Sequence, residues 1–154
     1  MPAGSEQALP SLPHTWRPFG IRVAVLGFGL TLFVVCAAAW FGFDESVRDR
    51  FTWLQRATLF AFAAGAVTCG WALGRARVTA EMESLVVVNG FKRRDLEWEE
   101  VLSVHLPPGA PWASLDLADG TTISAMAFQG SDGTRAQTAL RELRAVLASA
   151  STAG

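Results

Sequence analysis

Residues Val23 to Phe43 read VAVLGFGLTLFVVCAAAWFGF and contain no charged side chain. A helix rises about 1.5 Å per residue, so about 20 apolar residues cross a hydrocarbon core of roughly 30 Å. A second run begins near Phe51, and its uncharged part extends from Ala57 to Leu73. The sequence therefore predicts a transmembrane hairpin, with helices at residues 21–43 and 53–73 and a short loop at residues 44–52.

Tryptophans mark the expected ends of both helices. Trp16 and Trp40 bracket the first run, and Trp53 and Trp71 bracket the second. Indole favours the membrane interface because its body is apolar while its N–H needs a partner. A cleaved signal peptide is the alternative for the first run, since Ala37 to Ala39 resembles a small-residue cleavage site. The apolar run continues beyond these alanines, which favours a helix that is retained.

The composition agrees with a protein that has lipid-facing surface. Charged residues make up 18% of the chain and hydrophobic residues 51%, whereas soluble domains average about 25% charged. Basic residues before the first run and after the second outnumber those in and next to the loop. The former are Arg17, Arg22, Arg75, Arg77, Lys92, Arg93 and Arg94, and the latter are Arg48, Arg50 and Arg56. The positive-inside rule then predicts a multi-pass plasma-membrane protein with both termini in the cytoplasm.

Small residues follow one face of the second predicted helix at a spacing of four, namely Ala57, Ala61, Gly65 and Cys69. Such residues let helix backbones approach closely in lipid. The stripe predicts helix–helix association, with the first helix as the natural partner; a chance pattern in an alanine-rich helix is the alternative. The terminal segments, residues 1–20 and 151–154, are predicted to be disordered.

Residues 75–150 have the pattern of a small folded domain rich in strands. Short apolar or alternating runs are separated by turn signals, among them Asn89-Gly90 and Asp119-Gly120, which are typical of β-hairpins. From Thr134 the apolar residues recur at helical spacing instead. The predicted fold class is therefore a two-helix transmembrane hairpin plus an α+β domain, in which antiparallel strands are closed by a C-terminal α-helix.

The same stretch resembles a known family. The segments RVTAEMESLVVVNGFKRRDLEWEEVLSVHL and WASLDLADGTTISAMAFQ are similar to the pleckstrin-homology-like domain of small actinobacterial membrane proteins, the group that includes the mycobacterial low-molecular-weight antigen 6. The positions that fit the family pattern are Leu85, Val87, Asn89, Leu96, Trp98, Val101, Leu117, Asp119 and Gly120. The resemblance implies two packed sheets capped by a helix and no defined activity, since this fold serves lipid, peptide and protein binding.

Two sets of residues are candidates for binding. Arg75, Arg77, Lys92, Arg93 and Arg94 form a basic group that suits anionic lipid headgroups, although acidic residues outnumber basic ones in residues 75–154 and a solvated, charge-protected edge strand is the alternative. Trp112 follows a proline-rich loop and suits either the core or a partner-binding anchor.

The chain offers little for catalysis. Glu97, Glu99 and Glu100 lie in one predicted turn without a nearby histidine or cysteine, and His105 has no partner visible in the sequence. No nucleophile motif, phosphate-binding loop or metal-ligand spacing appears, and the net charge of −1 gives no general attraction to nucleic acid. We therefore predict a non-enzyme without cofactor or metal, an adaptor held in the lipid bilayer that binds an unknown protein or peptide. Anionic lipid binding or sensing is the alternative.

Overall fold

The computed structural model describes residues 9–153. Its contacts divide the chain into two compact units, one formed by residues up to 20 together with residues 75–154, and the other by residues 21–74.

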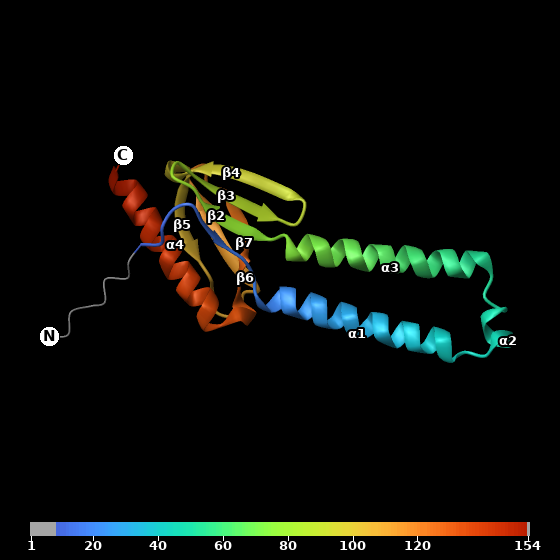
Figure 1. Cartoon of the computed structure of the whole chain (residues 1–154). Coiled ribbons are helices and arrows are strands. Elements are labelled where there is room, and N and C mark those ends of the chain that lie inside the picture. The colour runs from blue at the N-terminus through green and yellow to red at the C-terminus, as the bar shows by residue number, and fades with distance from the viewer. Residues whose placement is uncertain (1–8, 154) are drawn as a thin grey trace. The chain divides into compact units, whose positions relative to one another are not determined.

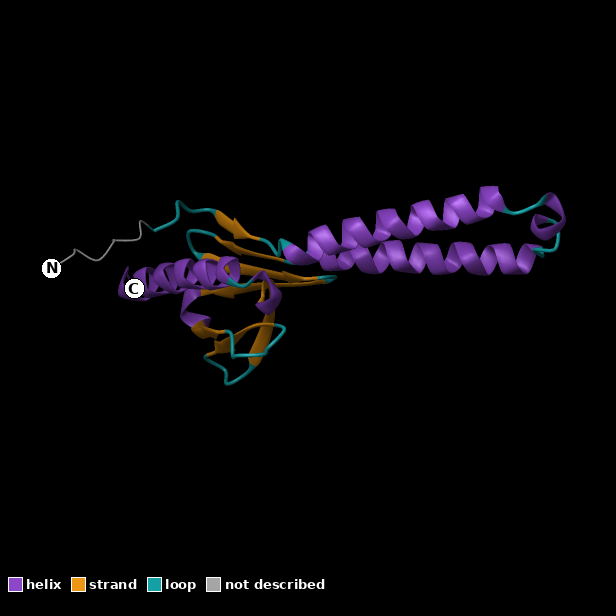
Figure 2. Cartoon of the chain, turned by 90° about the horizontal axis from the view of Figure 1, so that it is seen from below, coloured by secondary structure: helices purple, strands orange, loops and turns teal. Residues whose placement is uncertain are grey.

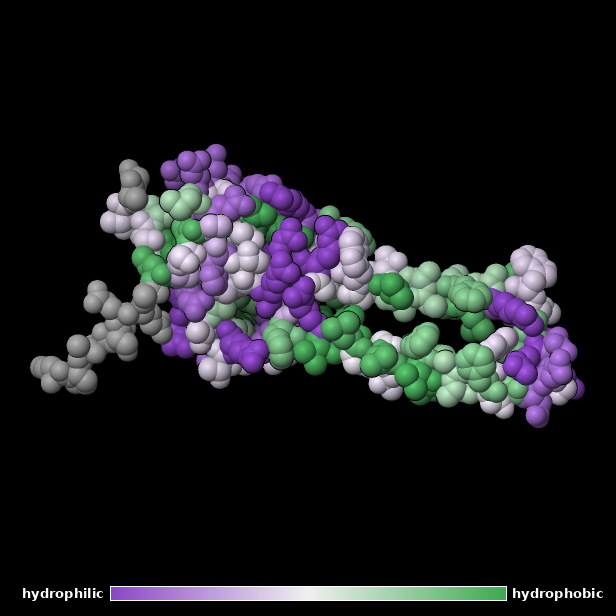
Figure 3. Space-filling view, in the orientation of Figure 1, coloured by the Kyte–Doolittle hydropathy of each residue, from purple (hydrophilic) through white to green (hydrophobic). Residues whose placement is uncertain are grey.

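The second unit is a helical hairpin. Helix α1 extends over Gly20–Gly42 and helix α3 over Trp53–Gly74, and the two run antiparallel (Figure 1). A short helix, α2 (Glu45–Arg48), lies in the connection that the sequence predicted as a loop. Both long helices are long and apolar enough to cross a membrane, and none of their side chains is buried within the chain. Figure 3 shows apolar surface along most of both helices and polar surface at the connection.

The two long helices touch each other at few points. Gly70 lies against α1, because a Cβ placed there would be 2.9 Å from Val25 Cγ1, and Arg22 Nε donates to the Gly74 carbonyl at 3.2 Å. At Gly65, by contrast, nothing lies within 4 Å of the Cβ position. The expected close approach of the first helix to the small-residue stripe is therefore absent at Gly65. Helix–helix association through the stripe stays a prediction.

The first unit is a two-sheet domain with a C-terminal helix (Figure 2). One sheet has the order β1-β2-β3-β4 and the other the order β5-β6-β7, and all neighbouring strands are antiparallel. The strands are β1 (His14–Trp16), β2 (Arg77–Ala80), β3 (Ser84–Asn89), β4 (Lys92–Glu97), β5 (Val101–His105), β6 (Trp112–Leu117) and β7 (Thr122–Gln129), with 3₁₀ turns η1 (Trp98–Glu100) and η2 (Gly130–Asp132). Helix α4 (Thr134–Ala153) covers the core between the sheets. The predicted fold class is confirmed.

Strand β1 overturns part of the prediction for residues 1–20. His14 pairs with Ala80 and Trp16 with Val78, so residues that were predicted to be disordered belong to the sheet. The prediction is wrong for residues 14–20; residues 9–13 belong to no helix or strand, and residues 1–8 lie outside the described part of the chain. A strand of three residues is too short to show alternation, and the prolines around it give the segment the composition of a flexible tail.

Trp16 is a core residue, and its predicted role as a membrane-interface marker is wrong. Its side chain is 6% exposed, and its ring centroid lies 5.8 Å from that of Phe128. The indole Nε1 donates to Glu142 Oε2 of α4 at 2.8 Å. A buried tryptophan needs such an acceptor because its N–H would otherwise lose its bond to water. Trp16 thus joins the first strand to the last helix.

The helical hairpin is an insertion between two neighbouring strands. Only Arg17, Pro18 and Phe19 separate β1 from α1, and Arg75 and Ala76 separate α3 from β2. Because Trp16 and Val78 are paired across β1 and β2, both ends of the hairpin are attached to one sheet within a few residues of the same strand pair.

The residues that lead into α1 are held by the domain. Asp132 accepts hydrogen bonds from the backbone N–H groups of Phe19 (3.0 Å) and Gly20 (2.8 Å). A Cβ at residue 20 would lie 2.5 Å from Asp132 Oδ1, so a larger residue there would displace this carboxylate. The guanidinium of Arg135 lies 4.2 Å from the centroid of the Phe19 ring. A carboxylate at this end of a helix satisfies free N–H groups and interacts favourably with the helix dipole.

Asn89 has a different role from the one its sequence predicts. Only Gly90 in the β3–β4 turn has a positive φ, 58°, and Asn89 is still in the strand, paired with Lys92. This places glycine first in a two-residue turn, as in the type II′ class. The Asn89 side chain donates to the Ser124 carbonyl and accepts from the Met126 N–H at 3.1 Å. The Asn89 amide therefore bonds to the backbone of β7 as a neighbouring strand would, and it links the two sheets.

Helix α4 continues to Ala153, so the prediction of disorder is wrong for residues 151–153. Hydroxyls in this last part bond back to helix carbonyls, for example Ser149 Oγ to Val146 and Ser151 Oγ to Ala148. The buried face of α4 is the predicted one: Ala136, Leu140, Leu143 and Val146 are all under 5% exposed.

The position of β1 predicts how the domain behaves without the hairpin. Residues 75–154 expressed alone lack β1 and Trp16, and we expect them to have no cooperative thermal unfolding transition by circular dichroism. Joining residue 20 to residue 75 through a short Gly-Ser linker restores the β1–β2 pair and should give a folded soluble domain. Within that joined domain, Trp16→Ala should lower the free energy of unfolding by about 3–5 kcal/mol.

Leu102→Ala, at a residue that is 64% exposed, is the matched control and should cost about 0.5 kcal/mol or less. Cooperative unfolding of residues 75–154 alone, at the same temperature as the joined domain, would contradict the assignment of β1 to the core.

Candidate binding surfaces

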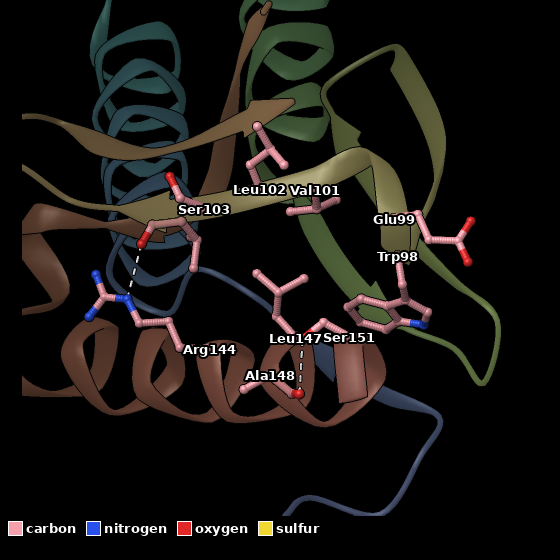
Figure 4. A pocket seen from close by; sticks show the side chains of 10 residues that line it. Trp98, Glu99, Val101, Leu102, Ser103, Arg144, Leu147, Ala148 and Ser151 are labelled. Carbon is pink, nitrogen blue, oxygen red and sulfur yellow. Dashed lines mark hydrogen bonds between the residues drawn. The ribbon is translucent and has the colours of Figure 1, made fainter. Parts of the chain in front are cut away.

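An open hollow lies between β5 and α4. We call it the β5–α4 groove; it is lined by Trp98, Glu99, Val101, Leu102, Ser103 and Val104 on one side and by Arg144, Leu147, Ala148 and Ser151 on the other (Figure 4). Its volume is ≈ 470 Å³, within the roughly 300–1,000 Å³ usual for ligand sites. The groove is thus large enough to hold a few side chains of a partner.

One wall of the groove is the edge of a sheet. Strand β5 is the outermost strand of β5-β6-β7. In an antiparallel ladder, alternate residues turn both their N–H and C=O groups away from the neighbouring strand. Val104 is one of these, because its carbonyl accepts a hydrogen bond from Arg144 Nε of α4 at 3.0 Å. Arg144 thereby covers part of an edge that would otherwise be open to strand pairing.

The groove is apolar in the middle and charged at its ends. Val101, Val104 and Leu147 supply buried or half-buried aliphatic surface, and Leu102 is 64% exposed. Glu99 lies at one end and Arg144 toward the other (Figure 4). A smaller hollow of ≈ 290 Å³, lined by Leu106, Gln137, Leu140 and Arg141, adjoins the first through Arg144. Arg144 therefore lines both hollows, and Glu99 lies at the far end of the larger one.

Trp98 closes the groove at the Glu99 end, beside the last turns of α4 (Figure 4). Its indole Nε1 is the one buried side-chain polar atom, among residues 9–153, that has no hydrogen-bond partner. A donor left in this state costs about 1–3 kcal/mol. Two of the three carboxylates beside it have a structural role: Glu97 and Glu100 form a reciprocal cap of η1, in which Glu100 Oε2 accepts from the Glu97 N–H at 2.8 Å.

The basic group of the sequence is divided by the fold. Lys92, Arg93 and Arg94 are consecutive in the edge strand β4, so alternate side chains point to opposite faces of the sheet. Arg93 forms an ion pair with Asp95 at 2.7 Å, and this partner lowers the pKa of the Asp95 carboxyl. Asp119 carries a carboxylate close enough to Arg94 for that charge to help lower the pKa of Asp119, although hydrogen bonds from Thr121 contribute more.

The two remaining arginines of the group do not join a single patch. Arg77 and Arg93 are both paired with Val88, from the two neighbouring strands, so they share one face of the sheet. Arg94 lies on the opposite face. Arg75 is half-buried in the connection before β2 and interacts with other residues of the chain. The structure therefore does not bring the five basic residues together on one surface.

Trp112 fits neither of its two predicted roles fully, which were a core residue and an exposed anchor for a partner. It begins β6 opposite Gln129 and is 37% exposed, so its ring is neither in the core nor fully free. The proline-rich loop before it is fixed by a hydrogen bond from the Gly130 N–H to the Pro111 carbonyl at 3.0 Å. The Ala110 carbonyl also lies where a Cβ of residue 130 would be. Trp112 remains a candidate contact residue outside the β5–α4 groove.

His105 has a partner that the sequence does not reveal. Its Nδ1 lies 3.3 Å from Asp116 Oδ2 across the β5–β6 pair. Ser103 and Thr122 donate to the same carboxylate at 2.7 and 3.0 Å, and these hydrogen bonds, more than the histidine, lower the pKa of Asp116. Because Ser103 bonds to the carboxylate and not to the imidazole, the group lacks the nucleophile–base contact of a hydrolase.

Within the described range 9–153, no cluster of three or more His, Cys, Asp or Glu side chains suits a metal ion. The groove residue that the sequence analysis missed is Arg144, which looks like an ordinary exposed residue of an amphipathic helix. Only the contact between α4 and β5 places its side chain at the sheet edge.

Comparison with known proteins agrees with this fold. Residues 75–145 match the family model described as Bacterial PH domain, which defines the folded unit as a pleckstrin-homology-like domain. The chain is 39% identical over 143 residues to the uncharacterized protein Rv1417 of Mycobacterium tuberculosis and to the uncharacterized protein Mb1452 of Mycobacterium bovis, covering 88% of this chain and 86% of each relative. The chain belongs to the same family as these mycobacterial proteins. No solved structure gives a significant match.

Proposed function

We propose that the protein is a membrane-anchored, non-catalytic adaptor whose domain binds a protein partner in the β5–α4 groove, at the inner face of the plasma membrane. The observation that carries the proposal is the insertion of the apolar hairpin between β1 and β2. An anchor inserted in this way is part of the fold of the binding domain and not a separate leader.

The paired strands favour a hairpin that crosses the membrane twice. Strands β1 and β2 exchange hydrogen bonds, so they must lie on the same side of the membrane, and only an even number of crossings allows this. Two helices of suitable length and apolarity connect them. Signal-peptide cleavage after Ala39 would remove β1 and the core residue Trp16, which argues against that alternative.

The groove is the surface that best fits a binding role. It combines aliphatic side chains, a sheet edge and a charged group at each end, the features by which domains recognise extended or partly apolar segments of a partner. The polar groups nearest to it, Ser103 with Asp116 and Glu97 with Glu100, are engaged in hydrogen bonds that stabilise the fold. This arrangement supports binding more than catalysis.

The orientation is testable by reporter fusions to the full chain. We expect a fluorescent-protein fusion at the C-terminus to fluoresce and an alkaline phosphatase fusion there to be inactive. A phosphatase inserted after Asp49 in the connection between the helices should be active. Phosphatase activity at the C-terminus would place the domain outside the cytoplasm and would contradict this part of the proposal.

Partner binding is testable by site-specific photo-crosslinking in a mycobacterial expression host. A photo-reactive residue at Leu102, in the groove, should give a crosslinked product of defined mass, whereas the same residue at exposed Glu83 should not. Ala148→Trp fills the groove and should abolish the product without lowering the amount of protein in the membrane. A product that survives Ala148→Trp, or that is equally strong from Glu83, would exclude the groove as the site.

Anionic lipid binding through Arg75, Arg77, Lys92, Arg93 and Arg94 is the second candidate. One observation favours lipid binding by a smaller set of residues. Phe91 at the tip of the β3–β4 turn is 68% exposed and precedes Lys92, which is also exposed. An exposed aromatic ring beside a basic side chain suits the headgroup region of a membrane. The pairing of Arg93 with Asp95 weakens the wider basic group.

Vesicle sedimentation tests this second candidate. If it holds, the domain made by joining residue 20 to residue 75 should sediment with phosphatidylglycerol vesicles more than with phosphatidylcholine vesicles. The difference should shrink in 0.5 M salt, an ionic strength at which the Debye length falls to about 4 Å, and on Lys92→Gln. Glu83→Gln is the control for a general change in net charge. Equal sedimentation with both kinds of vesicle would exclude specific binding of anionic lipid.

A further inference from the structure

The guanidinium of Arg144 is held in place with one side left open. Its Nε donates to the Val104 carbonyl at 3.0 Å, while its two Nη groups have no acceptor in the described part of the chain. The edge formed by these two nitrogens can bind a carboxylate through two parallel hydrogen bonds. Because the Nε bond already fixes the side chain, less conformational entropy is lost when a ligand binds.

The surrounding charges favour an acidic ligand at this end of the groove. Arg141 lies one turn before Arg144 on α4 and lines the adjoining hollow; its own guanidinium bonds back to the Gln137 carbonyl and to Thr138 Oγ1. Glu99 lies at the opposite end. A ligand carboxylate is therefore attracted to the Arg144 end and repelled from the Glu99 end.

The space between these charges suits an aliphatic side chain on an extended backbone. Val101, Val104 and Leu147 line it, and the N–H of Val104 faces the same open edge of β5 as its carbonyl. A peptide carbonyl can accept from this N–H, whereas an acidic lipid or a small organic acid uses neither the edge nor the spacing of alternate side chains.

We propose that the partner segment is an extended peptide in which a carboxylate, one or two residues from an aliphatic side chain, binds the Nη edge of Arg144. This inference rests on the proposed function and specifies the chemistry of the partner. The carboxylate comes either from an aspartate or glutamate side chain or from the C-terminus of the partner, since both present the same two oxygens.

The test is selection of random displayed heptapeptides on the full chain in lipid nanodiscs. Selection on the wild type should enrich Asp or Glu, or a free C-terminus, next to Leu, Ile or Val. For a selected peptide, Arg144→Gln should raise the dissociation constant about ten- to a hundred-fold, as expected for loss of a charged hydrogen-bonded contact. Arg144→Lys should restore part of the affinity, and Arg94→Gln, at an exposed arginine of β4, should leave the affinity unchanged.

Two synthetic versions of the selected peptide separate the sources of the carboxylate. One has an amidated C-terminus and keeps its acidic side chain, and the other has a free C-terminus and an amide in place of that side chain. Thermal unfolding of Arg144→Gln is measured in parallel, because this variant also loses the bond to Val104. Retained affinity in Arg144→Gln, or enriched peptides without a carboxylate, would overturn the inference.

The same experiment distinguishes this inference from the proposed function. Peptides that lose affinity on Ala148→Trp but not on Arg144→Gln would leave the groove as the binding site and refute the carboxylate. Failure to enrich any peptide over empty nanodiscs, with the crosslink at Leu102 still present, would refute an extended peptide while leaving a partner. Absence of both the enrichment and the crosslink would refute the two proposals together.

Discussion

The pairing of β1 with β2 is the contact on which the rest of the structure depends. It places Trp16 in the core, where its ring packs near Phe128 and its N–H bonds to Glu142 of the last helix. Removing those three residues of strand would take a large apolar side chain and an edge strand from a domain with a small core. The same pairing turns the apolar hairpin into an internal insertion, since the chain leaves the sheet after β1 and returns to it at β2.

Much of the architecture can be predicted from the sequence because its signals are long or repeated. The two apolar runs are each long enough for a membrane-spanning helix. Turn residues separate short apolar or alternating runs between β2 and β7, and α4 has an apolar stripe. What the sequence does not reveal comes from contacts between distant residues. The three residues of β1 carry no periodicity, and only the sheet shows that Trp16 packs in the core and not at a membrane boundary. Asn89-Gly90 does lie at a turn, but the asparagine side chain forms its hydrogen bonds with the other sheet.

The candidate site illustrates the same limit. A cluster of basic letters in a strand suggests a charged patch, yet alternation sends neighbouring side chains to opposite faces and Asp95 neutralises Arg93. Arg144, in contrast, has no basic neighbour within two residues in the sequence. It becomes a candidate binding residue because its side chain bonds to the carbonyl of Val104, forty residues away. A functional residue of this kind is defined by the strand edge beside which the helix packs, and that edge is a property of the tertiary structure.

The separation of β1 from β2 along the chain also sets an order of events during synthesis. Thr15 and Thr79, which share a hydrogen bond across these strands, are 64 residues apart, and the entire hairpin is made between them. Strand β1 therefore leaves the ribosome first and has no partner until both apolar helices have been synthesised and the chain has returned. In the proposed arrangement, in which the hairpin crosses the membrane twice, the domain is completed only in molecules whose two helix ends lie on one side of the bilayer. Insertion of both helices would then be a condition for folding the domain, and a chain inserted with a single crossing would keep an incomplete sheet.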